Sequence, residues 1–307
     1  MKVAAQVNVW TQRNDNSRTG ANLQETQLNT STVNVNQFGK LFSYVVDADV
    51  YSQPLVVQSV TIPGHGVHDV VYVATMNNSV YAFDADNTQS GALPLWHVNF
   101  NNPSAGIGPV STIDADAGGN IRSPGPVGIM GTPVVDQSTG TLYLVARTAL
   151  VNGGTTYRQH LHALDITTGA EKFGGPVLIT GAVPGSGYDN VGGVVTFNPL
   201  RENQRPGLAL ANGTIYISWA SHNDVDPWHG WVMAYDAHSL QQIGVLSTTP
   251  DGSEGGIWQS GQPPAIDSVG NLYFMIGNGS FSANQAGRNY GESLIKLDSG
   301  LTILQWA

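Results

Sequence analysis

The chain contains no cysteine in its 307 residues. This absence excludes disulfide bonds, thiolate metal sites and cysteine nucleophiles together. It assigns no compartment, because exported bacterial proteins often lack cysteine as well. Residues 1–6 hold no apolar core of the length that a signal peptide needs. We therefore expect a mature or trimmed form of a periplasmic or extracellular protein, with a cytoplasmic protein as the alternative.

Charged residues are also scarce, and positive charge is the scarcest kind. Asp, Glu, Lys and Arg make up 11% of the chain, about half of the roughly 25% typical of globular proteins. Lys and Arg number 12 against 22 Asp and Glu, which gives a formal net charge of −10. Phosphate backbones and anionic membranes repel such a surface, and no cluster of basic residues offers a local exception. We expect no nucleic-acid partner.

Long apolar runs are missing, and none approaches the ~18 residues that a membrane span needs. Long stretches with the composition and spacing of helices are missing too. Glycine, with 37 residues, is abundant together with Asn, Thr, Ser and Val, which are typical of strands and turns. Because 41% of the residues are hydrophobic, the chain can bury a sizeable core. The composition predicts an all-β protein without a membrane span.

One pattern recurs four times along the chain. Each copy has a Pro-led apolar run, a strand with Tyr, a strand that ends in Asp at a tight turn, and a fourth strand. The copies centre on Val71–Asp84, Leu142–Asp165, Ile215–Asp236 and Leu272–Asp298. Equivalent positions recur about every 60–80 residues, the length of a four-stranded blade with one long loop. The pattern predicts a β-propeller of four-stranded antiparallel blades near residues 53–100, 130–180, 205–248 and 262–307.

A β-sandwich is the structural alternative, but it would not explain why the same Asp follows each third strand. These residues are Asp84, Asp165, Asp236 and Asp298. We interpret them as turn formers that accept backbone N–H groups, because short acidic side chains commonly bond to the backbone two residues on.

Short motifs inside the units carry a family resemblance. They are Tyr81–Asp84 with Trp96, His162–Gly169, Met233–Asp236, and Leu297–Gly300 with Trp306. These motifs resemble the repeat of the quinoprotein, or PQQ-like, propellers, and Trp10 followed by Asn14–Gly20 is similar to their lead-in. The resemblance implies a bacterial, secreted or periplasmic propeller. It leaves the function open, because the repeat occurs in dehydrogenases and in outer-membrane assembly scaffolds.

Two features depart from the quinoprotein dehydrogenases that oxidise alcohols. Those enzymes carry a vicinal cysteine pair and close a ring of eight blades, whereas this chain has no cysteine and about four repeats. Within residues 1–52, the lead-in, Phe38–Val46 is expected as an outermost strand that closes a ring on three inner strands of another blade. Either the chain is a fragment of a longer propeller, or two copies combine to close the ring.

Ring closure by a homodimer is open to a direct measurement. If two copies close the ring, light scattering on the purified chain should give twice the mass of one chain. A monomer that still unfolds cooperatively would rule this dimer out.

The segment richest in side chains that could bind a ligand is Ser221–Trp231, which interrupts the third unit. Loops on a rigid scaffold are common positions for binding groups. Its candidate ligand-binding residues are His222, Asp224, Asp226, Trp228 and His229. They could bind a divalent metal, a sugar or a quinone, although the two histidines lack a recognisable metal-binding spacing. The alternative is a packed loop that a Trp pins to the blade.

Two further segments hold candidate residues. Trp258 lies in a glycine-rich connector and could form a flat floor under a ring-shaped ligand; the alternative is a Trp that belongs to the core. Asp114, Asp116 and Asn120 resemble part of an oxygen-rich Ca²⁺ loop. They lack the distant bidentate Glu of a full site, so a solvated turn is the alternative there.

Two functions remain in view. The first is an extracytoplasmic binding or scaffold module for a protein or glycan partner. The second is an oxidoreductase that oxidises an alcohol or sugar with PQQ and a divalent metal such as Ca²⁺, as the resemblance implies. No residue receives a catalytic role, because the Gly-x-Ser-x-Gly and His-Glu-x-x-His patterns are both absent.

Overall fold

The computed structural model describes residues 7–117 and 125–307, and most of the regular structure in them is β-strand. Four antiparallel sheets follow one another along the chain, and we call them blades 1 to 4. Blade 1 contains β1 (Leu55–Ile62), β2 (Gly66–Ala74), β3 (Ser79–Asp84) and β4 (Trp96–Asn99). Blade 2 contains β7 (Val134–Asp136), β8 (Thr141–Val151), β9 (Thr155–Asp165) and β10 (Val177–Leu178). Blade 2 is extended by β5 (Ile107–Ser111) and β6 (Pro126–Val127).

Blades 3 and 4 repeat the same order of strands. Blade 3 contains β14 (Ala209–Ala211), β15 (Thr214–Ser221), β16 (Trp231–Asp236) and β17 (Gln242–Ser247), and β13 (Glu202–Asn203) pairs with the end of β15. Blade 4 contains β18 (Ala265–Ile266), β19 (Leu272–Met275), β20 (Leu294–Leu297) and β21 (Ile303–Trp306). A separate hairpin joins β11 (Ala182–Pro184) to β12 (Val194–Thr196).

Helical structure is limited to single turns. The described helices are α1 (Thr112–Ala115) and the 3₁₀ turns η1 (Pro103–Ala105), η2 (Gln259–Gly261) and η3 (Ala283–Gln285). None of them is long and apolar enough to cross a membrane. The prediction of an all-β chain built from four-stranded antiparallel blades is confirmed.

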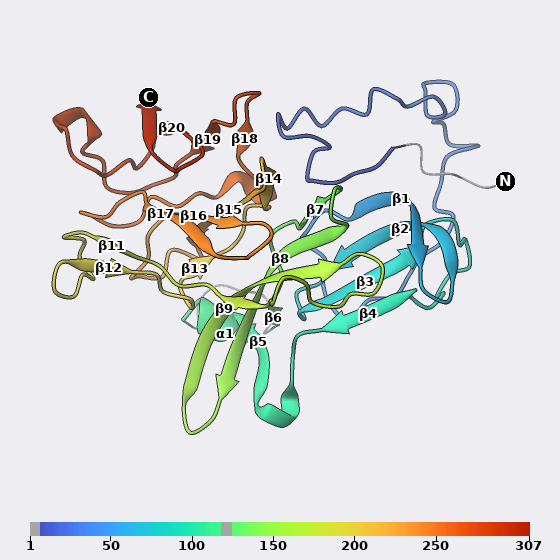
Figure 1. Cartoon of the computed structure of the whole chain (residues 1–307), viewed down its shortest axis with the longest axis horizontal. Coiled ribbons are helices and arrows are strands. Elements are labelled where there is room, and N and C mark those ends of the chain that lie inside the picture. Colours follow the sequence, from blue (N-terminus) through green and yellow to red (C-terminus); the bar gives the residue numbers. More distant parts are fainter. Residues whose placement is uncertain (1–6, 118–124) are drawn as a thin grey trace.

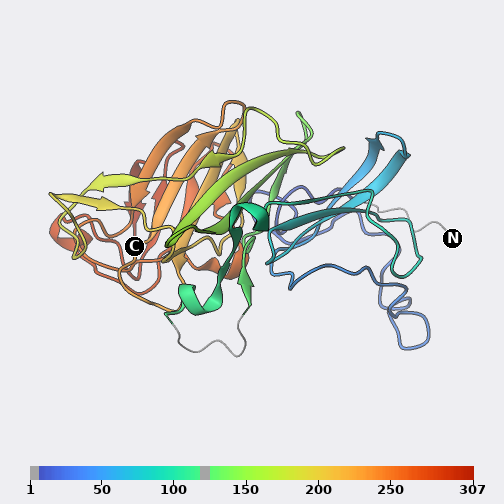
Figure 2. The same cartoon turned by 90° about the horizontal axis from the view of Figure 1, so that it is seen from below.

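The blades are arranged around an arc. In Figure 1 they run from blade 1 on the right, through β8 and β9 in the middle and β15 to β17 on the left, to blade 4 at the upper left. Figure 2 shows the two terminal blades, coloured blue and red, at opposite ends of the molecule. The described residues therefore form an open arc, and a closed ring is not seen within them.

The hydrophobic core lies between neighbouring blades. The middle strands of a blade are apolar on both faces, as Thr141–Val145 of β8 shows with five buried residues in succession. In blades 2 and 3, one face packs against the blade before and the other against the blade after, as expected for strands covered on both sides. The residues that fill the space between blades 2 and 3 include Tyr143, Leu161, Ile217 and Trp231.

A tyrosine hydroxyl links each blade to the next. Every donor lies in the second strand of its blade, and every acceptor is the carbonyl of the residue after the recurring Asp in the next blade. The pairs are Tyr72 to Ile166 at 2.9 Å, Tyr143 to Ala237 at 2.8 Å, and Tyr216 to Ser299 at 3.1 Å. We call this hydrogen bond the tyrosine latch. Burial raises the pKa of Tyr143 to about 12, so its hydroxyl keeps the proton that it donates.

The recurring aspartates form the turns that present these acceptor carbonyls. Each carboxylate accepts a backbone N–H two to four residues further along the chain. The pairs are Asp84 with Asp86, Asp165 with Thr167, Asp236 with Ser239, and Asp298 with Thr302. Their predicted role as turn formers is confirmed.

The beginning of the lead-in runs along the first strands of the blades. Trp10 accepts the N–H of Val135 in blade 2, and Asn16 accepts the N–H of Ile266 in blade 4. The Asn16 side chain donates to the carbonyl of Leu210 in blade 3, and Val9 pairs with a residue of β1 in blade 1. Residues 9–16 therefore contact the first strand of every blade.

Phe38–Val46, the expected ring-closing strand, forms no strand within the described chain, which does not contain the blade that it would complete. Tyr44 instead lies on the outer face of blade 1, where its ring stacks on Phe83 at 4.5 Å and its hydroxyl donates to the carbonyl of Asp84 at 2.7 Å. A strand needs a neighbour with free backbone groups, and no described sheet offers the three inner strands that this segment would complete.

Removal of one latch should destabilise the fold measurably. Tyr143→Phe deletes the hydroxyl and leaves the carbonyl of the buried Ala237 without its partner. We expect the free energy of unfolding to fall by about 1–2 kcal/mol, because an unsatisfied buried acceptor adds to the lost hydrogen bond. Urea denaturation measures this difference.

Tyr51→Phe provides the matched control for the Tyr143 variant. Tyr51 is 53% exposed, and its hydroxyl bonds to no residue that the structure describes. Its loss should change the stability by less than about 0.5 kcal/mol. Equal stability of the two variants would contradict a stabilising role of the latch.

Candidate functional site

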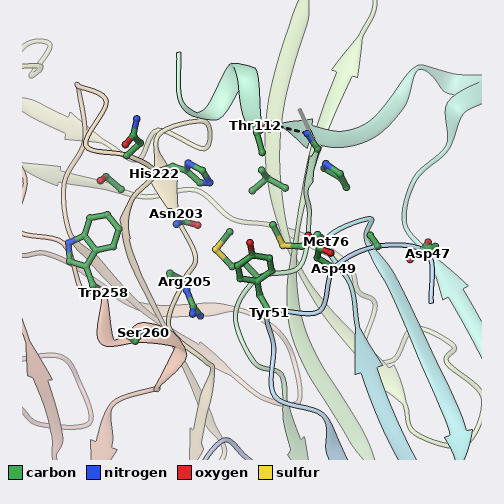
Figure 3. Close-up of a pocket in the computed structure, with 17 residues that line it drawn as sticks. Asp47, Asp49, Tyr51, Met76, Thr112, Asn203, Arg205, His222, Trp258 and Ser260 are labelled. Carbon is green, nitrogen blue, oxygen red and sulfur yellow. Dashed lines mark hydrogen bonds between the residues drawn. The ribbon is translucent and has the colours of Figure 1, made fainter. Parts of the chain in front are cut away.

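A cavity of about 790 Å³ opens where the segments that precede the first strands of the blades come together. Asp47–Tyr51 precedes β1, residues 125–130 precede β7, Asn203 and Arg205 precede β14, and Trp258 precedes β18. Corresponding places in the four repeats therefore contribute to one cavity. Figure 3 shows Trp258 on one side of it and Asp47 on the other, with Tyr51 and Met76 between them.

Trp258 is positioned by glycine and by a second tryptophan. A Cβ on Gly277 would lie 2.7 Å from Cδ1 of the indole, so only glycine allows the ring to pack this closely on the backbone. The fully buried Trp228 meets it edge to face, with ring centroids 6.1 Å apart. The half-buried indole is thereby held on the wall of the cavity.

Asn203 supplies the same cavity with a polar atom that bonds to no other described residue. The pairing of β13 with β15 holds its backbone opposite Ala220. The residue is only 4% exposed, yet its Oδ1 has no hydrogen-bond partner among the described residues. A buried polar atom without a partner costs free energy, so such atoms are rare unless a ligand, ion or water satisfies them.

On the opposite side of the cavity, the carboxylate of Asp47 is already hydrogen-bonded to other residues of the chain. Its carboxylate accepts hydrogen bonds from Ser79 at 2.6 Å, Thr75 at 2.8 Å and Asn77 at 2.9 Å. Partial burial pushes the pKa of Asp47 upward, but these three hydrogen bonds outweigh it and hold the pKa below its ordinary value. Asp47 therefore ties the lead-in to the turn between β2 and β3.

His222 lines the cavity as a neutral imidazole. Burial and the nearby Arg147 lower the pKa of His222, and the attraction of Asp116 opposes them. Its Nδ1 is hydrogen-bonded to the carboxylate of Asp116, so in the neutral ring Nδ1 carries the proton and Nε2 is an acceptor. Arg147 behind it is 1% exposed, and burial lowers the pKa of Arg147 to about 10, which still leaves it charged at neutral pH.

The remaining predicted residues of the Ser221–Trp231 loop do not line this cavity. Asp224 accepts the hydroxyl of Ser221 at 2.7 Å, and Asp226 accepts the hydroxyl of Tyr188 at 2.5 Å. Trp228 and His229 are fully buried, and His229 bonds to Asp189 at 2.9 Å and to Thr249 at 3.1 Å. The structure thus brings His222 and Trp258 together and assigns these four residues to the packing of the loop.

The predicted Ca²⁺ loop has no support in the described part of the chain. Asp114 lies in α1, where its N–H donates to Ser111, and Asp116 is turned inward against His222. Asn120 lies outside the described residues. Within 7–117 and 125–307, no group of three or more His, Asp or Glu side chains is placed to hold a metal ion.

Asn203, Arg205 and Tyr51 were not among the candidates that the sequence offered. A signal existed, because each lies just before the apolar run that opens a blade. Sequence alone does not show which of the residues in such a segment face the cavity, since a segment outside regular structure has no periodicity to indicate direction.

Neither a family model nor a curated protein matches this sequence. Among solved structures, the chain is similar to a europium-containing methanol dehydrogenase, with a TM-score of 0.53 and 15% identity. The match covers 97% of this chain and 48% of that enzyme. The fold is that of a quinoprotein-like β-propeller. At this identity the similarity shows the fold alone, and the chain spans about half the length of the methanol dehydrogenase.

Two other similarities are weaker and carry no argument. An exo-β-1,3-galactanase from Clostridium thermocellum matches with a TM-score of 0.32 and 13% identity, over 81% of this chain and 47% of that one. A cobalt-substituted Synechocystis ACO matches with a TM-score of 0.29 and 10% identity, over 85% and 50% of the two chains.

The packing of Trp258 against Gly277 can be tested by substituting the glycine. Gly277→Ala places a methyl group against the indole, so we expect the ring to shift and the protein to lose about 1–3 kcal/mol of stability. Near-UV circular dichroism reports the shift and urea denaturation the stability.

Gly39→Ala is the control for this substitution. A Cβ there meets no atom within 4 Å, and the change should stay within about 0.5 kcal/mol. An unchanged near-UV spectrum for Gly277→Ala would show that the indole is not held as described.

Proposed function

We propose that this chain is an extracytoplasmic binding module that holds a carbohydrate in the cavity between the blades. The observation that carries the proposal is Asn203, a buried amide whose Oδ1 has no partner among the described residues, on the same cavity as the half-buried Trp258. Sugars present apolar C–H faces and hydroxyl groups, so a flat aromatic ring with nearby hydrogen-bonding groups suits them. The volume of about 790 Å³ falls within the ~300–1,000 Å³ usual for ligand sites.

The acceptors on the wall match the hydroxyl groups of a sugar. Oδ1 of Asn203 has no partner in the described chain, and Nε2 of His222 is an acceptor in the neutral imidazole. A hydroxyl group donates to either of them and accepts from a further donor. Binding would therefore satisfy an atom that the free protein leaves unpaired, and this favours a hydroxylated ligand over an apolar one.

The second candidate function is a quinoprotein oxidoreductase, and the similarity in fold to the methanol dehydrogenase is the observation that favours it. Trp258 would suit one face of a flat quinone. The described residues do not fit the metal that accompanies it, because no three acidic or imidazole side chains converge and Asp47 is committed to three other partners.

We also propose that a partner binds at the open end of the arc, on the outer face of blade 4. On the outer face of blade 4, Met275 is 69% and Leu294 is 48% exposed. Tyr273, which corresponds to the latch tyrosines, donates within its own blade to Asp267. At the other end of the arc, Tyr44 covers part of the outer face of blade 1 by stacking on Phe83.

Calorimetric titration with mono- and oligosaccharides tests the carbohydrate site. We expect at least one sugar to bind, Trp258→Ala to weaken it at least about ten-fold through the lost apolar contact, and Asn203→Ala to weaken it about five-fold. Trp306→Ala is the matched control, because Trp306 is also partly exposed (39%) but lies on blade 4 away from the cavity.

The same protein, separated from free cofactor after incubation with PQQ and Ca²⁺, should retain no quinone absorbance and show no dye reduction with alcohols or aldoses. Dye reduction would favour the oxidoreductase. Sugar binding that survives Trp258→Ala, or no binding at all, would contradict the carbohydrate site.

A further inference from the structure

We infer that the carbohydrate held in this cavity carries a carboxylate, as a uronic acid does, and that Arg205 recognises it. The inference rests on the proposed function and adds the chemical class of the ligand. It comes from a cation on the cavity wall that forms no ion pair with a described residue, although Asp47 and Asp49 line the same cavity.

Arg205 is, with Arg13 and Arg158, one of the described arginines whose guanidinium has no partner among the described residues, and of these three only Arg205 lines the cavity. Arg18 donates to the carbonyl of Pro264, Arg147 to that of Leu200 and Arg201 to that of Asp114, and Arg288 forms an ion pair with Asp251. The Arg205 side chain forms no hydrogen bond or ion pair with any residue that the structure describes. Its N–H donors are therefore available to an anionic ligand.

The guanidinium is nevertheless held in place. A Cβ on Gly261 would lie 2.6 Å from Nη1 of Arg205, so the group packs against the bare backbone of that glycine. Tyr51 is close enough to affect it electrostatically, whereas Asp47 is engaged on the turn of blade 1. In the view of Figure 3, Arg205 lies between Trp258 and Tyr51, and Asp47 lies at the far end of the cavity.

Partial burial makes this arrangement unfavourable without a ligand. Burial lowers the pKa of Arg205, which shows that the surroundings disfavour its charge, although an arginine remains protonated at neutral pH. A half-buried charge without a partner is stabilised when an anion replaces the lost water. The planar guanidinium pairs best with a carboxylate or phosphate, through two parallel N–H to oxygen bonds.

Three groups from two neighbouring blades then match three parts of one ligand. Trp258, before blade 4, offers a face to the sugar ring, and Asn203, before blade 3, accepts a hydroxyl. Arg205 is two residues from Asn203 and takes the carboxylate. A neutral sugar would satisfy the first two groups and leave Arg205 unpaired, so we expect selectivity for the charged sugar.

The test compares glucose, glucuronate and glucose 6-phosphate by calorimetric titration. Glucose and glucuronate differ only at the sixth carbon, so their affinity ratio isolates the carboxylate. With the native chain, glucuronate should bind at least about ten-fold more tightly than glucose, the size expected of one charge-assisted hydrogen-bonded pair. Added salt should weaken glucuronate binding and leave glucose binding unchanged.

Variants assign the selectivity to one side chain. Arg205→Gln should bring the affinity ratio close to one while glucose still binds, and Arg205→Lys should give an intermediate ratio because it keeps the charge and loses the planar geometry. Arg288→Gln, which removes a paired arginine outside the cavity, should leave the ratio unchanged. Circular dichroism and thermal unfolding confirm that each variant is folded.

The outcomes separate this inference from the function on which it rests. If glucose binds as tightly as glucuronate, or if Arg205→Gln leaves their ratio unchanged, the carboxylate inference fails and the carbohydrate site stands. If glucose 6-phosphate binds more tightly than glucuronate through Arg205, the ligand is a phosphate and the inference also fails. If no sugar binds to the native chain, the proposed function fails first.

Discussion

The tyrosine latch is the contact on which the arrangement of the blades depends. A hydroxyl on the second strand of one blade donates to the carbonyl that follows the recurring Asp of the next blade, and this happens at all three interfaces of the chain. Apolar packing between sheets is non-directional and tolerates sliding. A hydrogen bond at a defined point of each interface does not tolerate such sliding, so it fixes the position of one blade relative to the next.

The latch also explains why Tyr and Asp recur together. The carboxylate of Asp165 forms the turn that presents the carbonyl of Ile166, and Tyr72 of the preceding blade reaches that carbonyl. The two residues belong to different units, so neither is explained by its own blade. At the start of the arc Tyr44 from the lead-in takes a comparable position on blade 1, with its hydroxyl on the carbonyl of Asp84.

The cavity is a consequence of this stacking. When successive blades are held in register, the segments before their first strands meet, and side chains from these segments line one space. There the Oδ1 of Asn203 and the half-buried guanidinium of Arg205 have no partner among the described residues. Such groups lower stability, and proteins retain them where a ligand completes them.

Local patterns in the sequence were sufficient for the strands and their turns. Ser79–Asp84 and Trp231–Asp236 read as strands that end in Asp, and β3 and β16 span these residues, because apolar alternation and turn chemistry act over a few neighbouring positions. The same reasoning predicts a strand at Phe38–Val46, but the strands that it would pair with are missing from the described chain, and the segment forms no strand there. A strand depends on its neighbour as well as on its own residues.

The candidate site depended on tertiary structure for a related reason. Tyr51 and Trp258 are about 200 positions apart and meet only because four blades stack around an arc. Within the single loop Ser221–Trp231, His222 faces the cavity while His229 is buried against Asp189. The sequence by itself determined the repeat, the strands and the turns, which arise from short-range periodicity. Only the tertiary structure decided which side chains face the cavity, because that choice depends on how separate blades are held against one another.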